Sequence, residues 1–426
     1  MNSLENKERN VLKDYANEPV PLSERRGWFG MALVQIGVCY AATAPLFALE
    51  MAKGLSFWNA MLACLIANMI LFVLFVVQGS IAAKEGLSTY MLARTSLGRG
   101  GAHILAIIIA ISCVGWFAIN AEYFATGLVS MIPSLGNIHL IAFFGGLLMM
   151  TTAVVGYKAI EKLSDIAVPL IILWCVLGAF KAYRIVGTSV FHTIPLGEPY
   201  GLMTGIIILV GGMSVGATIS PDIFRYGRSS KDIFLANLVY TVAAFFQPFL
   251  LMMTINGANT TDLPRIMGFL GPIGILVLIL LAWTTNDNNL YSASLAFTEI
   301  FPVTKWKVAV TFGFIGSIIA AIGILKYFTS WLSLLSSLAP PFIGIMAGDY
   351  YILPKIGLKS GLPLKRNEFI NWAGITAWLV GGILTALINT NKIKIYFPGP
   401  IIGVAVSLII YVLLMKLRHI NFDESI

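Results

Sequence analysis

Long runs of apolar residues, separated by short polar segments, recur along almost the whole chain. A helix needs roughly 20 apolar residues to cross about 30 Å of hydrocarbon. Runs of that length predict twelve membrane spans, an even number that places both ends of the chain on the same side. The spans cover residues 28–51, 57–82, 102–131, 138–156, 160–184, 200–224, 232–256, 270–300, 307–325, 328–353, 368–390 and 395–415.

The composition supports a membrane protein. Of 426 residues, 58% are hydrophobic and 11% are charged, whereas soluble domains carry about 25% charged residues. This excludes soluble enzymes, disordered scaffolds and small disulfide-stapled domains. The net charge of +8 comes from Lys and Arg scattered between apolar runs, which does not indicate a nucleic-acid surface. The cysteines lie inside apolar runs and are expected to be reduced thiols: Cys39, Cys64, Cys113 and Cys175.

Basic residues gather on one side of the predicted spans. The loops on the side of the membrane opposite the N-terminus hold only seven of the 28 Lys and Arg. These seven are Lys53, Lys181, Arg184, Arg265, Lys326, Lys392 and Lys394. Because basic residues favour the cytoplasmic side, both termini are expected there. The polar start of the chain resembles no signal peptide, so the first span is expected to insert without cleavage.

Two spans contain closely spaced small residues and proline. The first has Gly37 and Pro45, and the sixth has Gly211, Gly212, Gly216 and Pro221. Gly and Pro are common in membrane helices, but matching interruptions in two halves indicate a transporter built from inverted repeats. The predicted division is a tail at 1–27, repeats at 28–184 and 200–353, accessory helices at 368–415 and a tail at 416–426.

The eighth span contains six consecutive polar residues, Thr284 through Asn289. Buried polar groups in a membrane are costly and commonly functional, although some only join neighbouring helices. The hydroxyls of Thr284 and Thr285 are suitable ligands for a small cation, and carbonyls of a broken helix complete such a site. The amide of Asn286 both donates and accepts, which matches the edge of a nucleobase.

The third span carries Trp116 beside Gly115. A tryptophan in a membrane protein is often an interfacial anchor, but Trp116 lies well inside its span. Its ring offers a face on which a heterocycle can stack, and the neighbouring glycine lets a ligand or helix approach.

Several segments resemble the nucleobase:cation symporter family 1, most closely its bacterial cytosine permeases. They are PVPLSERRGW (19–28), CVGWF (113–117), ATISPDIFRYGR (217–228), AWTTNDNNLY (282–291) and LAPPFIGIMAGDYY (338–351). The resemblance implies an all-α, LeuT-like fold of twelve helices with a 5+5 inverted repeat, and sodium-driven import of a base by alternating access, in a chain that functions as a monomer.

The resemblance also assigns roles. Sodium would be held by backbone carbonyls of Gly37, Tyr40 and Leu281 and by the hydroxyls of Thr284 and Thr285. Trp116 would stack on the base, Asn286 would bond to its edge, and a break around Gly212 and Met213 would close the other side.

Four positions, in three departures, differ from a cytosine permease. Cys113 replaces a glutamine, Gly212 and Met213 replace serine and phenylalanine, and Val215 replaces a residue with a hydroxyl, for which Ser214 is a neighbouring substitute. Sites that hydrogen-bond their ligand discriminate through such groups. A purine, uracil or a pyrimidine vitamin precursor is therefore an alternative to cytosine.

Other mechanisms make different demands on the sequence. Proton coupling would use Glu122 or Asp287, unless each is a structural carboxylate. No HExxH motif or embedded Ser/His pair indicates an enzyme, and no cofactor other than the coupling ion is expected. A channel would need a ring of selective groups. An amino-acid carrier would need a clamp for a carboxylate, and nothing near Trp116 in the sequence is basic.

Overall fold

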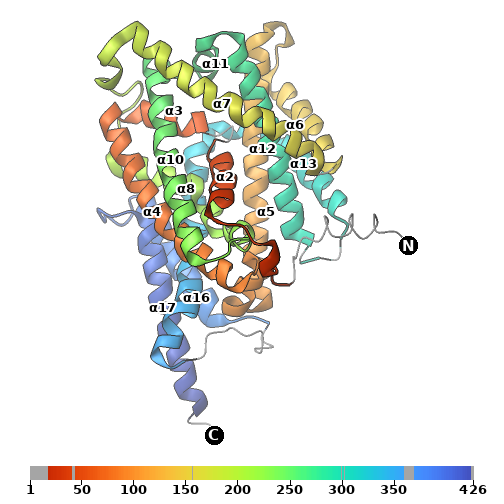
Figure 1. Ribbon diagram of the computed structural model, residues 1–426, viewed down its shortest axis with the longest axis vertical. Coiled ribbons are helices and arrows are strands. Elements are labelled where there is room, and N and C mark those ends of the chain that lie inside the picture. Colours follow the sequence, from red (N-terminus) through yellow and green to blue (C-terminus); the bar gives the residue numbers. More distant parts are fainter. Residues whose placement is uncertain are drawn as a thin grey trace.

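The chain is built almost entirely from helices (Figure 1). The computed structural model describes residues 18–40, 44–155, 157–298, 300–301, 303–358 and 369–423. Within this part, nine helices are long and apolar enough to cross a membrane, and two shorter apolar helices cover Ile138–Thr152 and Leu202–Thr218. The helical architecture agrees with the prediction, whereas the count of twelve spans and the inverted repeat stay predictions.

Two groups of helices pack side by side (Figure 1). The first group consists of α2 (Trp28–Cys39), α3 (Ala44–Gly54), α4 (Phe57–Glu85), α8 (Leu202–Thr218) and α10 (Ser230–Ala258). The second consists of α5 (Thr89–Met131), α6 (Ile138–Val155), α12 (Pro272–Thr298) and α13 (Lys305–Ile322). The remaining long helices are α7 (Tyr157–Val186), α14 (Phe328–Leu338), α15 (Pro340–Ala347), α16 (Trp372–Asn389) and α17 (Gly399–Asp423). Contacts within each group are extensive, with α12 lying along α5 and α4 along both α8 and α10.

The first predicted span is divided into two helices, as its small residues indicate. Helix α2 ends at Cys39, where Tyr40 leaves the helical conformation with φ −85° and ψ 37°, and α3 begins at Ala44. Residues 41–43 of the predicted interruption lie outside the described part. The last carbonyls of a helix lack intrahelical donors, so this end of α2 presents backbone oxygens of the kind that a cation needs.

The sixth span is interrupted within the run predicted from Gly211 to Pro221, but after Gly212 and Met213, where the family resemblance placed the break. Gly212 and Met213 are helical residues inside α8, which continues to Thr218. The interruption falls at Ile219 and Ser220, before the short helix α9 (Pro221–Phe224). Proline has no N–H to donate and suits the first turn of a helix, so Pro221 sets the break. The glycines of α8 allow close packing instead.

Two further predicted spans need comment. The tenth, predicted at 328–353, lies within one apolar segment, Ile324–Ile356, that is long enough to cross a membrane. Helix α15 begins at Pro340, and Ala339 between α14 and α15 keeps a helical backbone conformation. Helix α5 consists of two helices that meet at Gly98, whose φ of 76° and ψ of 171° are not helical and favour glycine. The first starts at Thr89, where the Ser88 hydroxyl caps its first turn, and the second runs on to Met131, so it agrees with the predicted span at 102–131.

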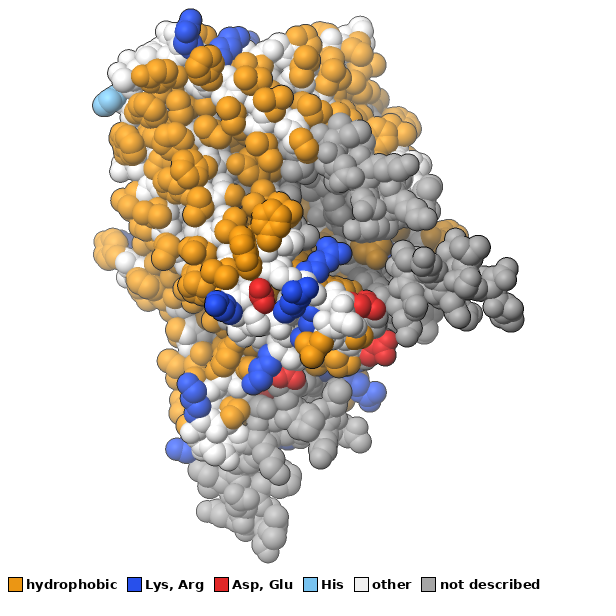
Figure 2. All heavy atoms as spheres, in the orientation of Figure 1, with side chains coloured by type: hydrophobic (Ala, Val, Ile, Leu, Met, Phe, Trp, Pro, Cys, Tyr) orange, Lys and Arg blue, Asp and Glu red, His pale blue; other side chains and the backbone are white. Residues whose placement is uncertain are grey.

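Apolar side chains cover much of the surface that faces the viewer in Figure 2, with charged groups gathered mainly toward the lower end. Helix α4 shows the pattern residue by residue. Its exposed large apolar residues share one face because they recur every three or four positions. They are Trp58, Leu62, Leu65, Met69 and Val73. An apolar helix face open to the outside suits contact with lipid.

Candidate substrate and ion site

Three aromatic rings from three helices meet around Trp116. This aromatic cluster consists of Phe47 on α3, Trp116 on α5 and Phe328 on α14. The Trp116 ring centroid lies 6.2 Å from that of Phe47 and 6.1 Å from that of Phe328, and both rings meet it edge-on. Trp116 is half-buried and packs against both large apolar cores of the protein. It therefore occupies the interior between helices and is not an interfacial anchor.

Glycines let helices approach the aromatic cluster closely. A methyl group at position 115 would lie 2.3 Å from the ring of Trp331 on α14, and one at position 212 would lie 2.3 Å from the ring of Phe47. Real side chains do not tolerate such contacts, so both positions require glycine in this packing. The structure thus brings Trp116 and Gly212, which are distant in sequence, onto the same ring of Phe47.

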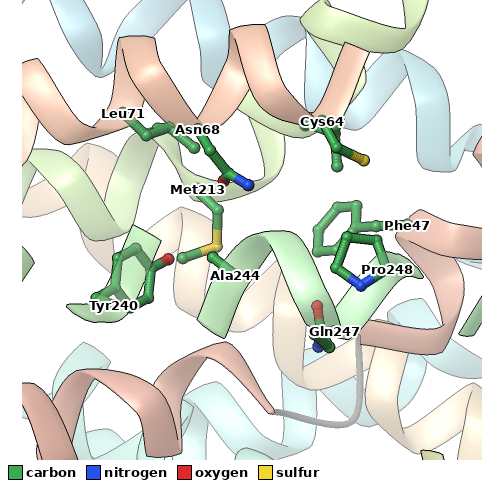
Figure 3. A pocket seen from close by; sticks show the side chains of 10 residues that line it. Phe47, Cys64, Asn68, Leu71, Met213, Tyr240, Ala244, Gln247 and Pro248 are labelled. Atoms are coloured by element: carbon green, nitrogen blue, oxygen red, sulfur yellow. The ribbon is translucent and has the colours of Figure 1, made fainter. Parts of the chain in front are cut away.

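A cavity of about 50 Å³ lies on the first helix group (Figure 3). It is lined from α3, α4, α8 and α10, and we call it the side cavity. The lining residues are Phe47, Cys64, Asn68, Leu71, Leu209, Met213, Tyr240, Ala244, Gln247 and Pro248. Met213 is the residue that the sequence assigned to the substrate site. Phe47 belongs both to this wall and to the aromatic cluster, so the two features adjoin.

Polar residues of the side cavity were not identified from the sequence. Asn68 stands alone in an apolar run of α4, and Gln247 precedes Pro248 in an apolar run of α10. A single buried amide is a weaker signal than the six-residue polar run of the eighth span. The pairing of a polar residue with a proline inside an apolar helix was the available clue.

The polar run on α12 joins this helix to α5 and α6. The fully buried Asn286 donates from Nδ2 to the Phe117 carbonyl at 3.1 Å and lies 3.0 Å from the sulfur of Met149. Its Oδ1 is buried without a hydrogen-bond partner. Asn286 therefore reaches the residue that follows Trp116, but its amide N–H group is occupied by α5, and Asn286 is not among the residues that line the side cavity.

Asp287 extends the same contact to α6. Its Oδ1 lies 2.7 Å from the hydroxyl of Thr152, which also accepts from the Trp283 ring N–H at 2.8 Å. Asp287 is 1% exposed, and its Oδ2 has no hydrogen-bond partner. Glu122 has a different role, since its carboxylate accepts from the Leu325 N–H at 2.9 Å and so fixes the start of the segment after α13.

The predicted sodium ligands lie on both helix groups. On α12, the Thr284 hydroxyl donates to the Leu281 carbonyl at 3.0 Å, and Thr285 is half-buried beside it. Gly37 lies in the last turn of α2 and Tyr40 directly after it. A cation held by all five would connect α2 to α12, and therefore one helix group to the other.

Cys113 and Ser214 lie in the apolar interior. Cys113 is a free thiol, 5% exposed, in the same apolar core as Val215. Ser214 is fully buried, and its hydroxyl donates to the Gly211 carbonyl of its own helix at 2.8 Å. Cys64 and Cys175 are also buried and form no disulfide, as predicted, whereas the side chain of Cys39 lies outside the described part.

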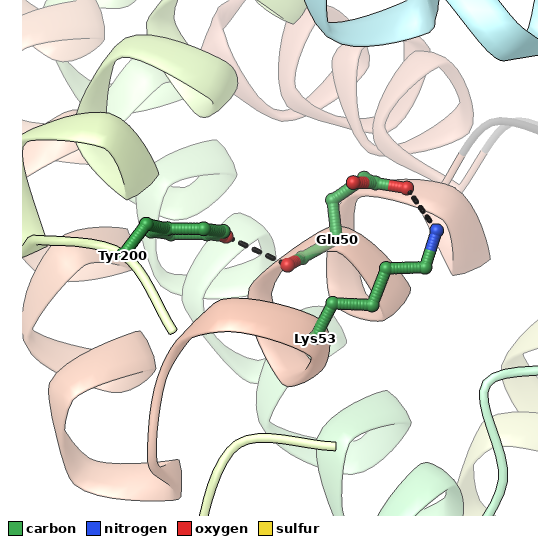
Figure 4. A network of polar contacts seen from close by, with 3 residues as sticks. All are labelled: Glu50, Lys53 and Tyr200. Carbon is green, nitrogen blue, oxygen red and sulfur yellow. Dashed lines mark hydrogen bonds and ion pairs between the residues drawn. The ribbon is translucent and has the colours of Figure 1, made fainter. Parts of the chain in front are cut away.

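A short segment before α8 fixes the end of α3, the helix that carries Phe47. The Tyr200 hydroxyl donates to the Glu50 carbonyl at 2.6 Å, and the Glu50 carboxylate pairs with Lys53 at 2.7 Å (Figure 4). The Tyr200 N–H also donates to the Gly54 carbonyl. A side chain at position 54 would overlap the Tyr200 ring, because its first carbon would lie 1.9 Å from that ring.

Comparisons with known proteins match nearly the whole chain. The profile of a family described as "Permease for cytosine/purines, uracil, thiamine, allantoin" matches residues 19–407. The cytosine permease of Escherichia coli strain K12 is 31% identical over 379 residues, which cover 86% of this chain and 88% of that protein. These relatives are permeases rather than enzymes.

Solved structures agree with the fold. The inward-facing conformation of Mhp1 matches with a TM-score of 0.79 at 20% identity, covering 95% of this chain and 93% of the other. A closed conformation of Mhp1 with bromovinylhydantoin bound, from a nucleobase-cation-symport-1 family transporter, matches with a TM-score of 0.74 at 19% identity, covering 94% and 95%. The LeuT-like fold predicted from the motifs is confirmed by this likeness.

Proposed function

We propose that this chain, which belongs to the nucleobase:cation symporter family 1, imports a nucleobase or a closely related heterocycle together with sodium. The family predicted from the sequence motifs is confirmed by the match to residues 19–407 and by the 31% identity to a cytosine permease. The protein is thus a multi-pass membrane transporter. We further propose that it functions as a monomer in a bacterial inner membrane, with both termini in the cytoplasm.

The observation that carries the proposal is the aromatic cluster. Trp116 lies between the helix groups, keeps part of its ring exposed and has the edges of Phe47 and Phe328 beside it. A planar base stacked on an aromatic ring gains about 1–3 kcal/mol, and Gly212 lets the Phe47 ring pack closely at the edge of this site. Asn286 supplies the polar contact once its amide exchanges the Phe117 carbonyl for the base.

Sodium binding explains how transport would be driven. Gly37, Tyr40 and Leu281 would contribute carbonyls, and Thr284 and Thr285 hydroxyls. Because these ligands belong to both helix groups, sodium stabilises the arrangement in which the groups come together, and so does the base. Two ligands that favour one state strengthen each other's binding, typically by 1–3 kcal/mol.

The base need not be cytosine. Cys113 offers a thiol in an apolar environment, and Met213 offers a flexible apolar side chain. The Ser214 hydroxyl already donates a hydrogen bond within its own helix. Fewer fixed donors surround the base than in a site built for cytosine alone. A purine, uracil or a pyrimidine vitamin precursor is the alternative substrate.

Proton coupling is the second candidate, favoured by Asp287. A buried carboxylate without a basic partner among the described residues is costly when charged, and its Oδ2 makes no hydrogen bond. Glu122 is a weaker candidate because it already accepts from the backbone at Leu325.

Uptake of radiolabelled bases into proteoliposomes tests both mechanisms. The proposal predicts saturable uptake that requires an inward sodium gradient and fails in Thr285→Val. Thr241→Val is the matched control, since the Thr241 hydroxyl donates within its own helix, to the Asn237 carbonyl. Uptake that is independent of sodium, follows an imposed pH gradient and fails in Asp287→Asn would identify the proton, and not sodium, as the coupling ion. Absence of uptake for every base would refute the proposed substrate class.

A further inference from the structure

The side cavity lies directly behind two residues of the proposed substrate site. Phe47 has Trp116 at one edge and the cavity at another, and Met213 projects into the cavity from α8 (Figure 3). Gly212, the neighbour of Met213, lies against the same Phe47 ring. Phe47 is therefore shared by the aromatic cluster and the cavity wall, and the flexible thioether of Met213 lines the same cavity.

One polar group in the side cavity has hydrogen-bonding capacity to spare. Asn68 is half-buried, and its amide makes no hydrogen bond with any part of the chain that the structure describes. Figure 3 shows this amide directed from α4 toward Met213, with Tyr240 and Gln247 on the opposite wall. Polar groups inside proteins are normally satisfied. The arrangement thus suits an occupant that brings its own donor or acceptor.

The size of the side cavity limits that occupant. One water molecule needs about 10–15 Å³ of such space, so 50 Å³ accommodates a few waters or a side arm of two or three non-hydrogen atoms. A whole second base does not fit. The cavity can connect to the aromatic cluster when Met213 changes rotamer, which an unbranched thioether does readily.

We infer that the side cavity is a subsite for a short polar arm, such as a hydroxymethyl or aminomethyl group, carried by the transported base. The ring stacks at Trp116, and the arm passes beside Met213 to hydrogen-bond with the amide of Asn68. This inference rests on the proposed function, which it narrows to substituted heterocycles. Met213, which stands in place of a bulkier and stiffer aromatic residue, is the feature that lets the arm reach the side cavity.

Binding to the purified full-length protein tests the subsite. The probes are cytosine and uracil, their 5-methyl forms and their 5-hydroxymethyl forms, measured by competition against a radiolabelled base. We expect the hydroxymethyl forms to bind more tightly than the methyl forms, which lack the hydroxyl. Asn68→Leu keeps the volume of the side chain but leaves the arm's hydroxyl unpaired, and it should reduce this preference about tenfold. The affinity for the unsubstituted bases should change less than about twofold, because they do not reach Asn68.

Two further variants sharpen the test. Ala244→Leu fills the cavity from α10 and should weaken both the methyl and the hydroxymethyl forms relative to the unsubstituted base. Met69→Leu changes the next residue of α4, whose side chain is 53% exposed on the outer face, and should change nothing. The subsite is refuted if Asn68→Leu alters all bases equally or none, or if the wild-type protein does not prefer the hydroxymethyl forms, which would leave water as the occupant. If the wild-type protein binds no base at all, the proposed function fails instead.

Discussion

Replacing Gly212 by alanine is expected to damage the substrate site by displacing one aromatic ring. The added methyl would lie 2.3 Å from two ring carbons of Phe47. Carbon atoms in contact sit about 3.5–4.0 Å apart, so the ring must retreat by more than about 1 Å. Phe47 then loses its edge contact with Trp116, which is 6.2 Å between centroids in the structure.

The magnitude follows from these contacts. An extra methyl in a packed interior costs about 1–3 kcal/mol, and an aromatic pair contributes about 0.5–1.5 kcal/mol. If about 1.4 kcal/mol of this appears at the site, the KM for the transported base rises about tenfold. The maximal rate should change less, because Phe47 belongs to the proposed base site and not to the proposed sodium site.

Initial uptake rates in proteoliposomes, normalised to the amount of inserted protein, separate KM from the maximal rate. Gly201→Ala is the matched control, since a methyl at position 201 meets only open space. The double variant Gly212→Ala with Phe47→Leu removes the clashing ring and should have a KM close to that of Phe47→Leu alone. The reasoning is refuted if Gly212→Ala keeps the wild-type KM, or if its defect simply adds to that of Phe47→Leu.

Three other predictions concern the packing around the site. Gly211→Ala places a methyl 2.5 Å from a backbone oxygen of α14, and a backbone atom cannot move aside as a side chain does. Gly211→Ala should therefore lower the apparent Tm in detergent more than Gly212→Ala does. An equal or smaller decrease would contradict this prediction. Tyr200→Phe removes the hydrogen bond to α3, worth about 1 kcal/mol, and should increase hydrogen exchange at residues 196–200, measured by mass spectrometry; unchanged protection would contradict it. Arg25→Met removes a buried guanidinium that donates to two backbone carbonyls. Each charged hydrogen bond contributes about 1.5–3 kcal/mol, so this variant should lower the apparent Tm. Arg26→Met, at an exposed side chain, should leave the apparent Tm unchanged.

The sequence predicted the elements that depend on composition and periodicity. Apolar runs of sufficient length indicate membrane helices wherever they occur, and small residues around Gly37 indicated the division between α2 and α3. The interior position of Trp116 followed from its distance to the ends of its span. These features are local, so neighbouring residues are enough to infer them.

Features that depend on the partner of a residue were not predictable. A glycine in an apolar run either breaks a helix or admits a neighbour, and only the position of Phe47 shows that Gly212 does the second. Likewise Asn286 was expected to face a ligand, and the structure shows its amide on the Phe117 carbonyl. Asn68 carries no sequence signal of its own, because its significance comes from Met213 and Tyr240 across the side cavity.

The central claim is that a base and sodium bind one state of this transporter and stabilise it together. The most direct measurement is the Kd of a radiolabelled base for the purified wild-type protein as choline is replaced by sodium. We predict that sodium tightens base binding about 5- to 150-fold, and that the base tightens sodium binding by the same factor. Equal affinity for the base in choline and in sodium would contradict the claim.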